Sequence, residues 1–206
     1  MTITFAKLGQ YGRLGNSLFQ VSSAIALASR NDDNFSFPEW EYQEDFYIPK
    51  VFSKTLPTYP TYEEPHFHFA PIPYRRFLNI HGYFQSVRYF DDCEDIIKRM
   101  LMPKYIGNFS EYTSIHVRRG DYLIHKGCYN ILNMENYYEK AIEACFGKKY
   151  LIFSDDIPWC KRHFIGNNFD FSEERNPVKD LGNMLSCSNH IIANSSFSWW
   201  GSWLSP

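Results

Sequence analysis

Short apolar segments alternate with segments of helical spacing throughout the second half of this chain. The strand-like segments cover residues 113–117, 150–154 and 189–193, and the helical ones cover residues 134–146, 156–163 and 179–187. Strands that alternate with helices in this way are typical of a parallel sheet with helices on its faces. The alternation therefore predicts an α/β fold for this half of the chain.

The first half begins in the same way and then becomes irregular. Residues 2–6 are alternating and β-branched, residues 9–16 form a glycine-rich turn, and residues 17–30 have the apolar spacing of a buried helix. This order is one half of a βαβ unit. Residues 35–77 are rich in Pro, Tyr and Phe with little periodicity, which is typical of a long functional loop or insertion.

Regular structure is predicted again from residue 78. A strand-like segment covers residues 78–84, a helix is predicted from Ser86 to about Leu101, and residues 103–110 have the composition of a linker. A chain of 206 residues with 44% hydrophobic side chains can bury the core of one domain or of two small ones. We expect two domains, residues 1–108 and residues 109–206.

Charge and cysteine content exclude several classes of protein. The 21 basic and 23 acidic side chains nearly cancel, so no overall field attracts nucleic acid or an anionic membrane, and any anion site must be local. No signal-peptide pattern and no membrane-spanning segment is found, so we expect a soluble, cytoplasmic protein. The five cysteines have no metal-ligand spacing and are interpreted as reduced thiols: Cys93, Cys128, Cys145, Cys160 and Cys187.

An arginine pair ends the first strand-like segment of the second half. Residues 115–122 have the sequence IHVRRGDY, and strand alternation puts His116 and Arg118 on one side and Arg119 on the other. A guanidinium donates bidentately to phosphate, and open α/β sheets bind ligands at the carboxyl ends of their strands. By itself the motif fits a phosphate site and a surface Arg–Asp ion pair of small energetic value equally well.

Two carboxylates follow the next strand-like segment. Asp155 and Asp156 come directly after residues 150–154, where carboxylates can ligate Mg²⁺, pair with an arginine or accept from a sugar hydroxyl. The order Ser-Asp-Asp-Ile-Pro is also a good helix N-cap, which explains at least one of the two acids. An arginine that already serves a phosphate disfavours the metal interpretation.

Hydroxyl side chains follow the third strand-like segment. Residues 194–200 have the sequence NSSFSWW, which suits phosphate binding at a strand-to-helix junction and equally suits the cap of a buried aromatic helix. Asp180 can accept from two donors of a guanine ring, or it is another acid at a helix start. The turn Gly9-x-x-Gly12-x-x-Gly15-Asn16 fits neither a dinucleotide nor a P-loop spacing and alone indicates only a tight turn.

These polar groups follow strands of one predicted parallel sheet. Arg118, one of the Asp155–Asp156 pair and one of the Ser195–Ser196 pair would meet at the same edge. Independent turns and caps have no reason to gather there. The coincidence predicts a nucleotide-diphosphate site.

Five motifs together resemble the alpha-1,2-fucosyltransferase family. The resemblance runs from about residue 3 to the last residue, and the five motifs are specific because they occur in the family's order. They are GRLGN at residues 12–16, GYFQS at 82–86, HVRRGDY at 116–122, FSDD at 153–156 and NSSFSWW at 194–200.

The resemblance implies a GT-B-like architecture, in which two Rossmann-type domains face a cleft and the C-terminal one holds GDP-fucose. It implies an enzyme that transfers L-fucose with inversion to the 2-hydroxyl of a galactose-type glycan acceptor. No metal or other cofactor and no nucleic acid partner are implied. The implied place is the cytoplasm or the periphery of a membrane where glycans are built.

The resemblance also implies roles for individual residues. Arg118 would hold the β-phosphate, His116 and Asp121 would organise that strand end, and Asp180 would read guanine. Asn16 would reach across the cleft to the donor. The general base stays open among Asp121, Asp155, His116 and a carboxylate within residues 35–77. The implied substrate-binding positions are Gly15, Asn16, Arg118, Arg119, Asp155, Asp156, Asp180, Asn194, Ser195, Ser196 and Phe197.

The last motif stands close to the end of the sequence, whereas the family continues beyond it. We therefore expect an incomplete C-terminal domain that exposes Trp199, Trp200 and Trp203. Two alternatives to the main hypothesis stay open. One is an inactive GDP-sugar- or glycan-binding remnant, and the other is a fucosyltransferase that acts on another acceptor.

Overall fold

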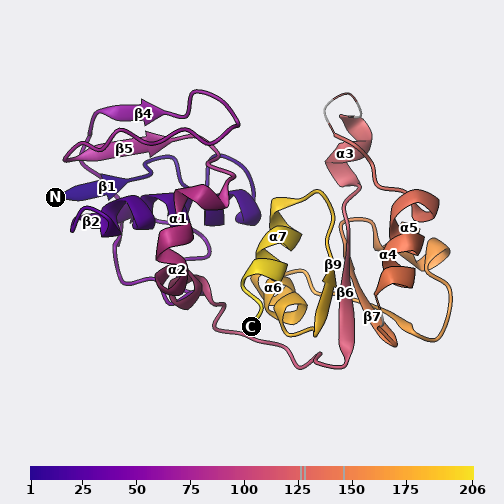
Figure 1. Ribbon diagram of the computed structural model, residues 1–206. Coiled ribbons are helices and arrows are strands. Elements are labelled where there is room, and N and C mark those ends of the chain that lie inside the picture. Colours follow the sequence, from indigo (N-terminus) through magenta and orange to yellow (C-terminus); the bar gives the residue numbers. More distant parts are fainter. Residues whose placement is uncertain (126, 128, 146) are drawn as a thin grey trace. The chain divides into compact units, whose positions relative to one another are not determined.

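Two parallel β-sheets, one in each half of the chain, form the framework of the structure (Figure 1). This computed structural model describes residues 1–125, 127, 129–145 and 147–206. The chain divides into two compact units, Met1–Lys104 and Tyr105–Pro206, and the predicted boundary falls four residues later. The predicted α/β class with parallel sheets is confirmed.

The first unit contains a five-stranded sheet in the order β3-β2-β1-β5-β4, and every pair is parallel. Helix α1 (Leu14–Ser29) connects β1 to β2 and buries almost its whole length, because Leu18, Val21 and Ile25 are fully covered. The strands are β1 (Thr2–Thr4), β2 (Asn34–Pro38), β3 (Phe52–Ser53), β4 (Thr61–Glu63) and β5 (Leu78–His81).

One sequence prediction for this unit holds and another is wrong. Residues 35–77 are largely irregular, as expected, and contribute only the short strands β2, β3 and β4 to the sheet. The helix predicted from Ser86 begins as two 3₁₀ turns, Val87–Tyr89 and Asp91–Cys93, and only α2 (Glu94–Leu101) is α-helical. Phe90 is completely buried with a φ of −151°, outside the helical region, so tertiary packing outweighs helical propensity at that point.

The second unit contains a four-stranded parallel sheet in the order β8-β7-β6-β9. Its strands are β6 (Tyr112–Val117), β7 (Lys149–Ser154), β8 (Phe169–Phe171) and β9 (Asn189–Ile191). Its helices are α3 (Gly120–Ile124), the π-helical turn η3 (Met134–Tyr138), α4 (Glu139–Ala144), α5 (Ile157–His163), α6 (Pro177–Leu185) and α7 (Ser196–Trp203).

Helices cover both faces of this second sheet (Figure 1). Along β7, Ile152 packs with the cluster that contains Phe164 at the end of α5, whereas Phe153 packs with Met184 of α6. Alternate side chains of a strand point to opposite faces, so both faces of β7 are apolar. The result is a three-layer α/β/α unit.

Several details of this unit differ from the predictions. Strand β8 and helix α3 were not predicted, and α3 begins at the Gly120-Asp121 step that was interpreted as a turn. Trp200, which was expected to be exposed, is completely buried, and Trp199 and Trp203 are only partly exposed. The described cysteines are free thiols, and Cys128 lies outside the described residues. Within the described ranges, no helix combines the length and apolar character needed to cross a bilayer.

Candidate functional site

The predicted site residues of the second unit gather at one edge of its sheet. Strand register aligns Val117 with Ser154 and Ile115 with Ile191, so the segments after β6, β7 and β9 leave the sheet side by side. This is the carboxyl edge of a parallel sheet, where ligands bind in open α/β folds.

Arg118 lies at the centre of this edge between two carboxylates. Its Nη1 donates to Asp155 Oδ2 at 2.5 Å, and its Nη2 donates to Asp121 Oδ1 at 2.5 Å. The guanidinium lies 5.2 Å from the centre of the Tyr122 ring, and the Arg118 side chain is only 14% exposed. This arrangement differs from a mobile surface ion pair, because the side chain is held from several directions.

Asp155 also holds the backbone that follows β6. Its Oδ1 accepts the N–H of Arg119 at 2.9 Å and the N–H of Gly120 at 3.2 Å. A Cβ at position 120 would overlap the Asp155 carboxylate, so a glycine is needed for this close approach. One carboxylate therefore positions both the Arg118 guanidinium and the start of α3.

Arg119 and Asp156 lie together on the α5 side of the sheet edge. Arg119 Nε donates to Asp156 Oδ2 at 3.1 Å, and its guanidinium lies 3.9 Å from the Trp159 ring centre. Asp156 also caps α5 by accepting the N–H of Trp159 at 3.1 Å, as the sequence predicted for one of the two acids. These contacts explain the pair structurally, and a substrate contact for either residue stays a prediction.

His116 connects β6 to α7 from inside the protein. Its Nδ1 lies 2.9 Å from the Ser198 hydroxyl, which also accepts the N–H of Ala193 at 3.2 Å. Burial lowers the pKa of His116 to about 4, so the imidazole is neutral at pH 7. Phe197 lies beside this ring, with 5.5 Å between ring centres, and packs on the apolar cluster under α6.

The loop after β9 is joined to the segment around α3. The Tyr122 hydroxyl donates to the carbonyl of Asn194 at 2.9 Å, and Asn194 Nδ2 donates to the carbonyl of Asn130 at 2.9 Å. Ser195 is the N-cap residue of α7, but its side chain makes no capping hydrogen bond. Ser196 is the first helical residue. Both serines therefore lie at the helix start at the same sheet edge.

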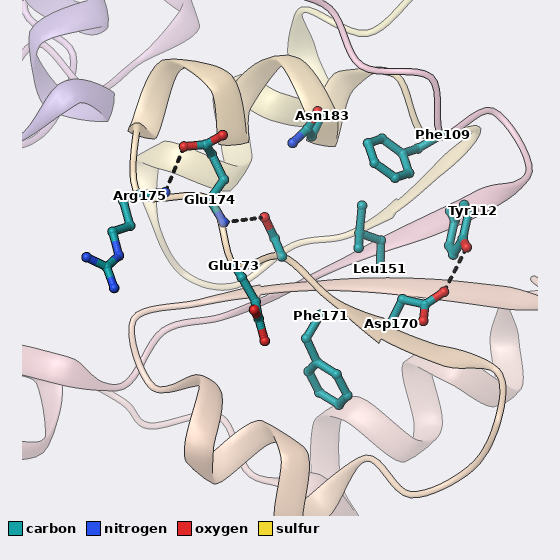
Figure 2. A pocket seen from close by; sticks show the side chains of 10 residues that line it. Phe109, Tyr112, Leu151, Asp170, Phe171, Glu173, Glu174, Arg175 and Asn183 are labelled. Carbon is teal, nitrogen blue, oxygen red and sulfur yellow. Dashed lines mark hydrogen bonds between the residues drawn. The ribbon is translucent and has the colours of Figure 1, made fainter.

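Asp180 occupies the first turn of α6 and faces the segment that follows β8. It accepts the Ser172 hydroxyl at 2.5 Å, and burial raises its pKa to about 6. Ser172 lines a pocket of about 640 Å³ on the α6 side of the sheet (Figure 2). This pocket was not predicted from the sequence. Its walls combine apolar, polar and charged groups: Phe109, Tyr112, Leu151, Asp170, Phe171, Ser172, Glu173, Glu174, Arg175 and Asn183.

Two further predicted positions, Gly15 and Asn16, lie in the first turn of α1 in the first unit. Asn16 Oδ1 accepts from Gln85 Nε2 at 2.7 Å, so the motifs at residues 12–16 and 82–86 meet within that unit. Among the residues that the structure describes, no cluster of three or more His, Cys, Asp or Glu side chains has the arrangement of a metal site.

The fold and the site define an α/β protein with parallel sheets and an arginine held at the carboxyl edge of one of them. The family model described as "Glycosyl transferase family 11" matches residues 34–206. The chain belongs to this family, and the resemblance noted from the motifs is confirmed at that level.

Curated relatives carry related names. The alpha-1,2-colitosyltransferase of Escherichia coli is 33% identical over 144 residues, which cover 60% of this chain and 50% of that protein. The Escherichia coli O-antigen biosynthesis glycosyltransferase WbnK is 34% identical over 152 residues, which cover 60% of this chain and 49% of that protein. Mouse galactoside alpha-(1,2)-fucosyltransferase 2 is 23% identical over 96% of this chain and 67% of that protein. The chain thus spans about half the length of the two bacterial relatives.

Solved structures share the fold. The crystal structure of the fucosyltransferase NodZ from Bradyrhizobium has a TM-score of 0.60 at 12% identity, covering 97% of this chain and 92% of that chain. A crystal structure of NodZ alpha-1,6-fucosyltransferase soaked with GDP-fucose has a TM-score of 0.54 at 14% identity. The match covers 100% of this chain and 92% of that chain. At such identities the likeness shows the fold alone.

Proposed function

We propose that this protein transfers L-fucose from GDP-fucose to the 2-hydroxyl of a galactose-containing glycan, with inversion at the sugar carbon. The observation that carries this proposal is Arg118, held between Asp121 and Asp155 at the carboxyl edge of the second sheet. Family membership and the names of the relatives support the choice of sugar and linkage.

Arg118 acts where negative charge develops. Departure of GDP leaves an oxocarbenium-like sugar and increases the charge on the β-phosphate. The guanidinium has five N–H groups, and the two carboxylates accept one from each terminal nitrogen, so further donors are available for phosphate oxygens. A preorganised donor at such a position is commonly worth about 3–4 kcal/mol of barrier lowering.

His116 serves this site as a positioning residue. With a pKa of about 4 it is a weak base at neutral pH, and its ring is buried against Ser198. It holds the start of α7, where Ser195 and Ser196 would contact the nucleotide. We assign no single general base: with an oxocarbenium-like transition state the acceptor proton leaves late, to water or to a phosphate oxygen of the departing GDP.

Asp180 is proposed to read the guanine ring. A carboxylate accepts from two neighbouring N–H donors of guanine, which adenine does not offer in the same arrangement. Ser172, which donates to Asp180 at 2.5 Å, lines the neighbouring pocket, and this link between Asp180 and a pocket wall supports the proposed role.

A second donor is favoured by one observation. The alpha-1,2-colitosyltransferase is among the relatives with the highest identity, and colitose is a fucose that lacks one hydroxyl. Rates with GDP-fucose and GDP-colitose, measured side by side, distinguish the two donors.

The first test is the thermal stability of the purified chain with GDP and with ADP. A ligand that binds the folded state raises the melting temperature, so a rise with GDP but not ADP supports the nucleotide site. Transfer from GDP-fucose to lactose is then measured directly. A cooperative melt that neither nucleotide shifts would contradict the proposal.

A further inference from the structure

A row of four aromatic rings lies at the carboxyl edge of the first sheet. We call Phe67, Tyr83, Tyr11 and His81 the ring row. Tyr11 and Tyr83 are stacked, with 4.5 Å between ring centres and 29° between planes, and Phe67 lies 6.0 Å beyond Tyr83. On the other side, Tyr11 lies 5.1 Å from His81. His81 is the last residue of β5, and the other three rings follow β1, β4 and β5, which are neighbours in the sheet.

Accessibility increases along the ring row. The His81 side chain is 16% exposed, Tyr11 and Tyr83 are partly exposed, and Phe67 is 79% exposed. Phe67 is presented by a short turn, because His66 Nδ1 and the carbonyl oxygen of His68 lie 3.0 Å apart. A large apolar ring is therefore held in water at the open end of a stacked series.

The backbone under the ring row is fixed by one carboxylate and one amide. Glu64 accepts the N–H of Tyr83 at 2.7 Å and the N–H of Phe84 at 3.0 Å. Gln20 Nε2 donates to the carbonyls of Tyr11 and Gly82 at 2.9 and 3.3 Å, which joins the two loops that carry the stacked tyrosines. This framework holds the rings in place without a ligand, which lowers the entropy cost of binding.

The chemistry of the ring row favours a neutral sugar over a phosphate. Two carboxylates contact its residues: Glu63 Oε2 lies 2.6 Å from His81 Nδ1, and Glu64 accepts the backbone N–H of Tyr83. Aromatic faces pack against the C–H face of a pyranose, while the nearby amides of Asn16 and Gln85 can exchange hydrogen bonds with hydroxyl groups.

We propose that the ring row binds a pyranose ring of the acceptor glycan, with Phe67 and Tyr83 as the stacking surface. This inference rests on the proposed transferase function and names the residues that select its acceptor. Tyr11 packs against Tyr83 and His81 packs against Tyr11, so these two rings hold the stacking surface in place.

The experiment measures the dissociation constant of lactose by NMR titration of the full chain and its variants. We expect Phe67→Ala and Tyr83→Leu to weaken lactose binding about tenfold, which corresponds to a lost aromatic contact. Phe67→Tyr keeps the ring and should bind lactose like the wild type. Tyr47→Ala is the matched control, because Tyr47 is 57% exposed in the same unit and outside the ring row.

The GDP-induced rise in melting temperature is measured for every variant and should not change. If lactose binding is absent in the wild type or unaffected by Phe67→Ala and Tyr83→Leu, the inference is overturned, and an intact GDP response still supports the proposed function. If lactose binding depends on the rings but no variant responds to GDP, the ring row stands and the proposed function fails. A concentration-dependent dimer that Phe67→Ala dissociates without a change in lactose binding would assign the rings to contact between copies.

Discussion

Arg118 illustrates how neighbouring side chains hold a guanidinium in a fixed direction. Asp121 and Asp155 each accept one N–H from it, and Tyr122 lies beside its face. Two fixed carboxylates need a planar fork with donors in defined directions, which arginine has and lysine lacks.

We therefore predict that Arg118→Lys weakens GDP binding at least tenfold and abolishes transfer. An ammonium group is a compact point charge and cannot contact both carboxylates and a phosphate at once. Isothermal titration with GDP measures the loss. Arg162→Lys, at an exposed position of α5, is the control. GDP affinity that is unchanged in Arg118→Lys would remove this residue from the phosphate site.

The raised pKa of Asp180 predicts two opposite pH dependences. Guanine recognition needs the carboxylate, so GDP affinity should fall as the pH drops from 7 towards 5, through the pKa of about 6. Folded Asp180 binds its proton more tightly than the unfolded chain, in which the carboxyl group has its ordinary pKa of 3.8. The stability that this group adds is therefore complete below about pH 4 and is lost as the pH rises through about 6.

Asp180→Asn should remove both dependences and reduce the preference for GDP over ADP. Titration calorimetry and thermal melts between pH 5 and pH 7.5 measure them on the same samples. Retention of the wild-type GDP-to-ADP ratio in the variant would exclude Asp180 from base recognition.

At the scale of elements, the junction between β6 and α3 depends on a glycine, which has no side chain. Gly120 lets the Asp155 carboxylate reach two backbone N–H groups. We predict that Gly120→Ala lowers the free energy of unfolding by about 1–3 kcal/mol, because the added methyl displaces Asp155 and leaves those groups unpaired. GDP affinity should fall with it, because Asp155 also holds Arg118.

Urea unfolding and GDP titration measure the two effects of Gly120→Ala. Gly127→Ala is the matched control, since a Cβ at that position meets no atom within 4 Å among the described residues outside its chain neighbours. Equal stability of the two variants would show that Asp155 does not depend on the close approach.

The elements also show where sequence reasoning succeeds and fails. Strands β6 and β7 were predicted within one residue of their bounds, because both contain β-branched or apolar side chains on both faces and both are buried along most of their length. Strand β8 was missed because its three residues, Phe-Asp-Phe, are not part of a longer apolar segment, and α3 was missed because Gly120-Asp121 is a common turn signal. Short edge strands depend on their neighbours more than on their own sequence.

The site, too, was predictable only where strand order and strand ends determine which residues meet. Arg118 and one of the Asp155–Asp156 pair were predicted to meet because parallel strands end at one edge, and in the structure Asp155 contacts Arg118. The pocket of Figure 2 could not be predicted, since it is lined by side chains from four separate segments that share no motif. The role of each residue in binding stays a prediction until ligands are tested.

At the scale of the whole molecule, the proposed mechanism places the charge of departing GDP on protein donors. We predict that transfer activity stays largely intact in the presence of EDTA, because in the proposed mechanism Arg118 and neighbouring N–H groups stabilise the leaving phosphate. Initial rates with and without EDTA, using lactose as acceptor, test this. Activity that is lost with EDTA and restored by Mg²⁺ would instead make Asp155 and Asp156 metal ligands.

The strand orders of the two sheets have a consequence for synthesis of the chain. In each unit the strand that comes first in the sequence, β1 or β6, lies inside the sheet and is flanked by strands made later. The β1–β5 and β6–β9 pairings join residues about 75 positions apart, and such long-range contacts slow folding. On the ribosome, each unit must therefore wait for its late strand before its first strand is paired on both sides. The first unit can finish while the second is still being translated.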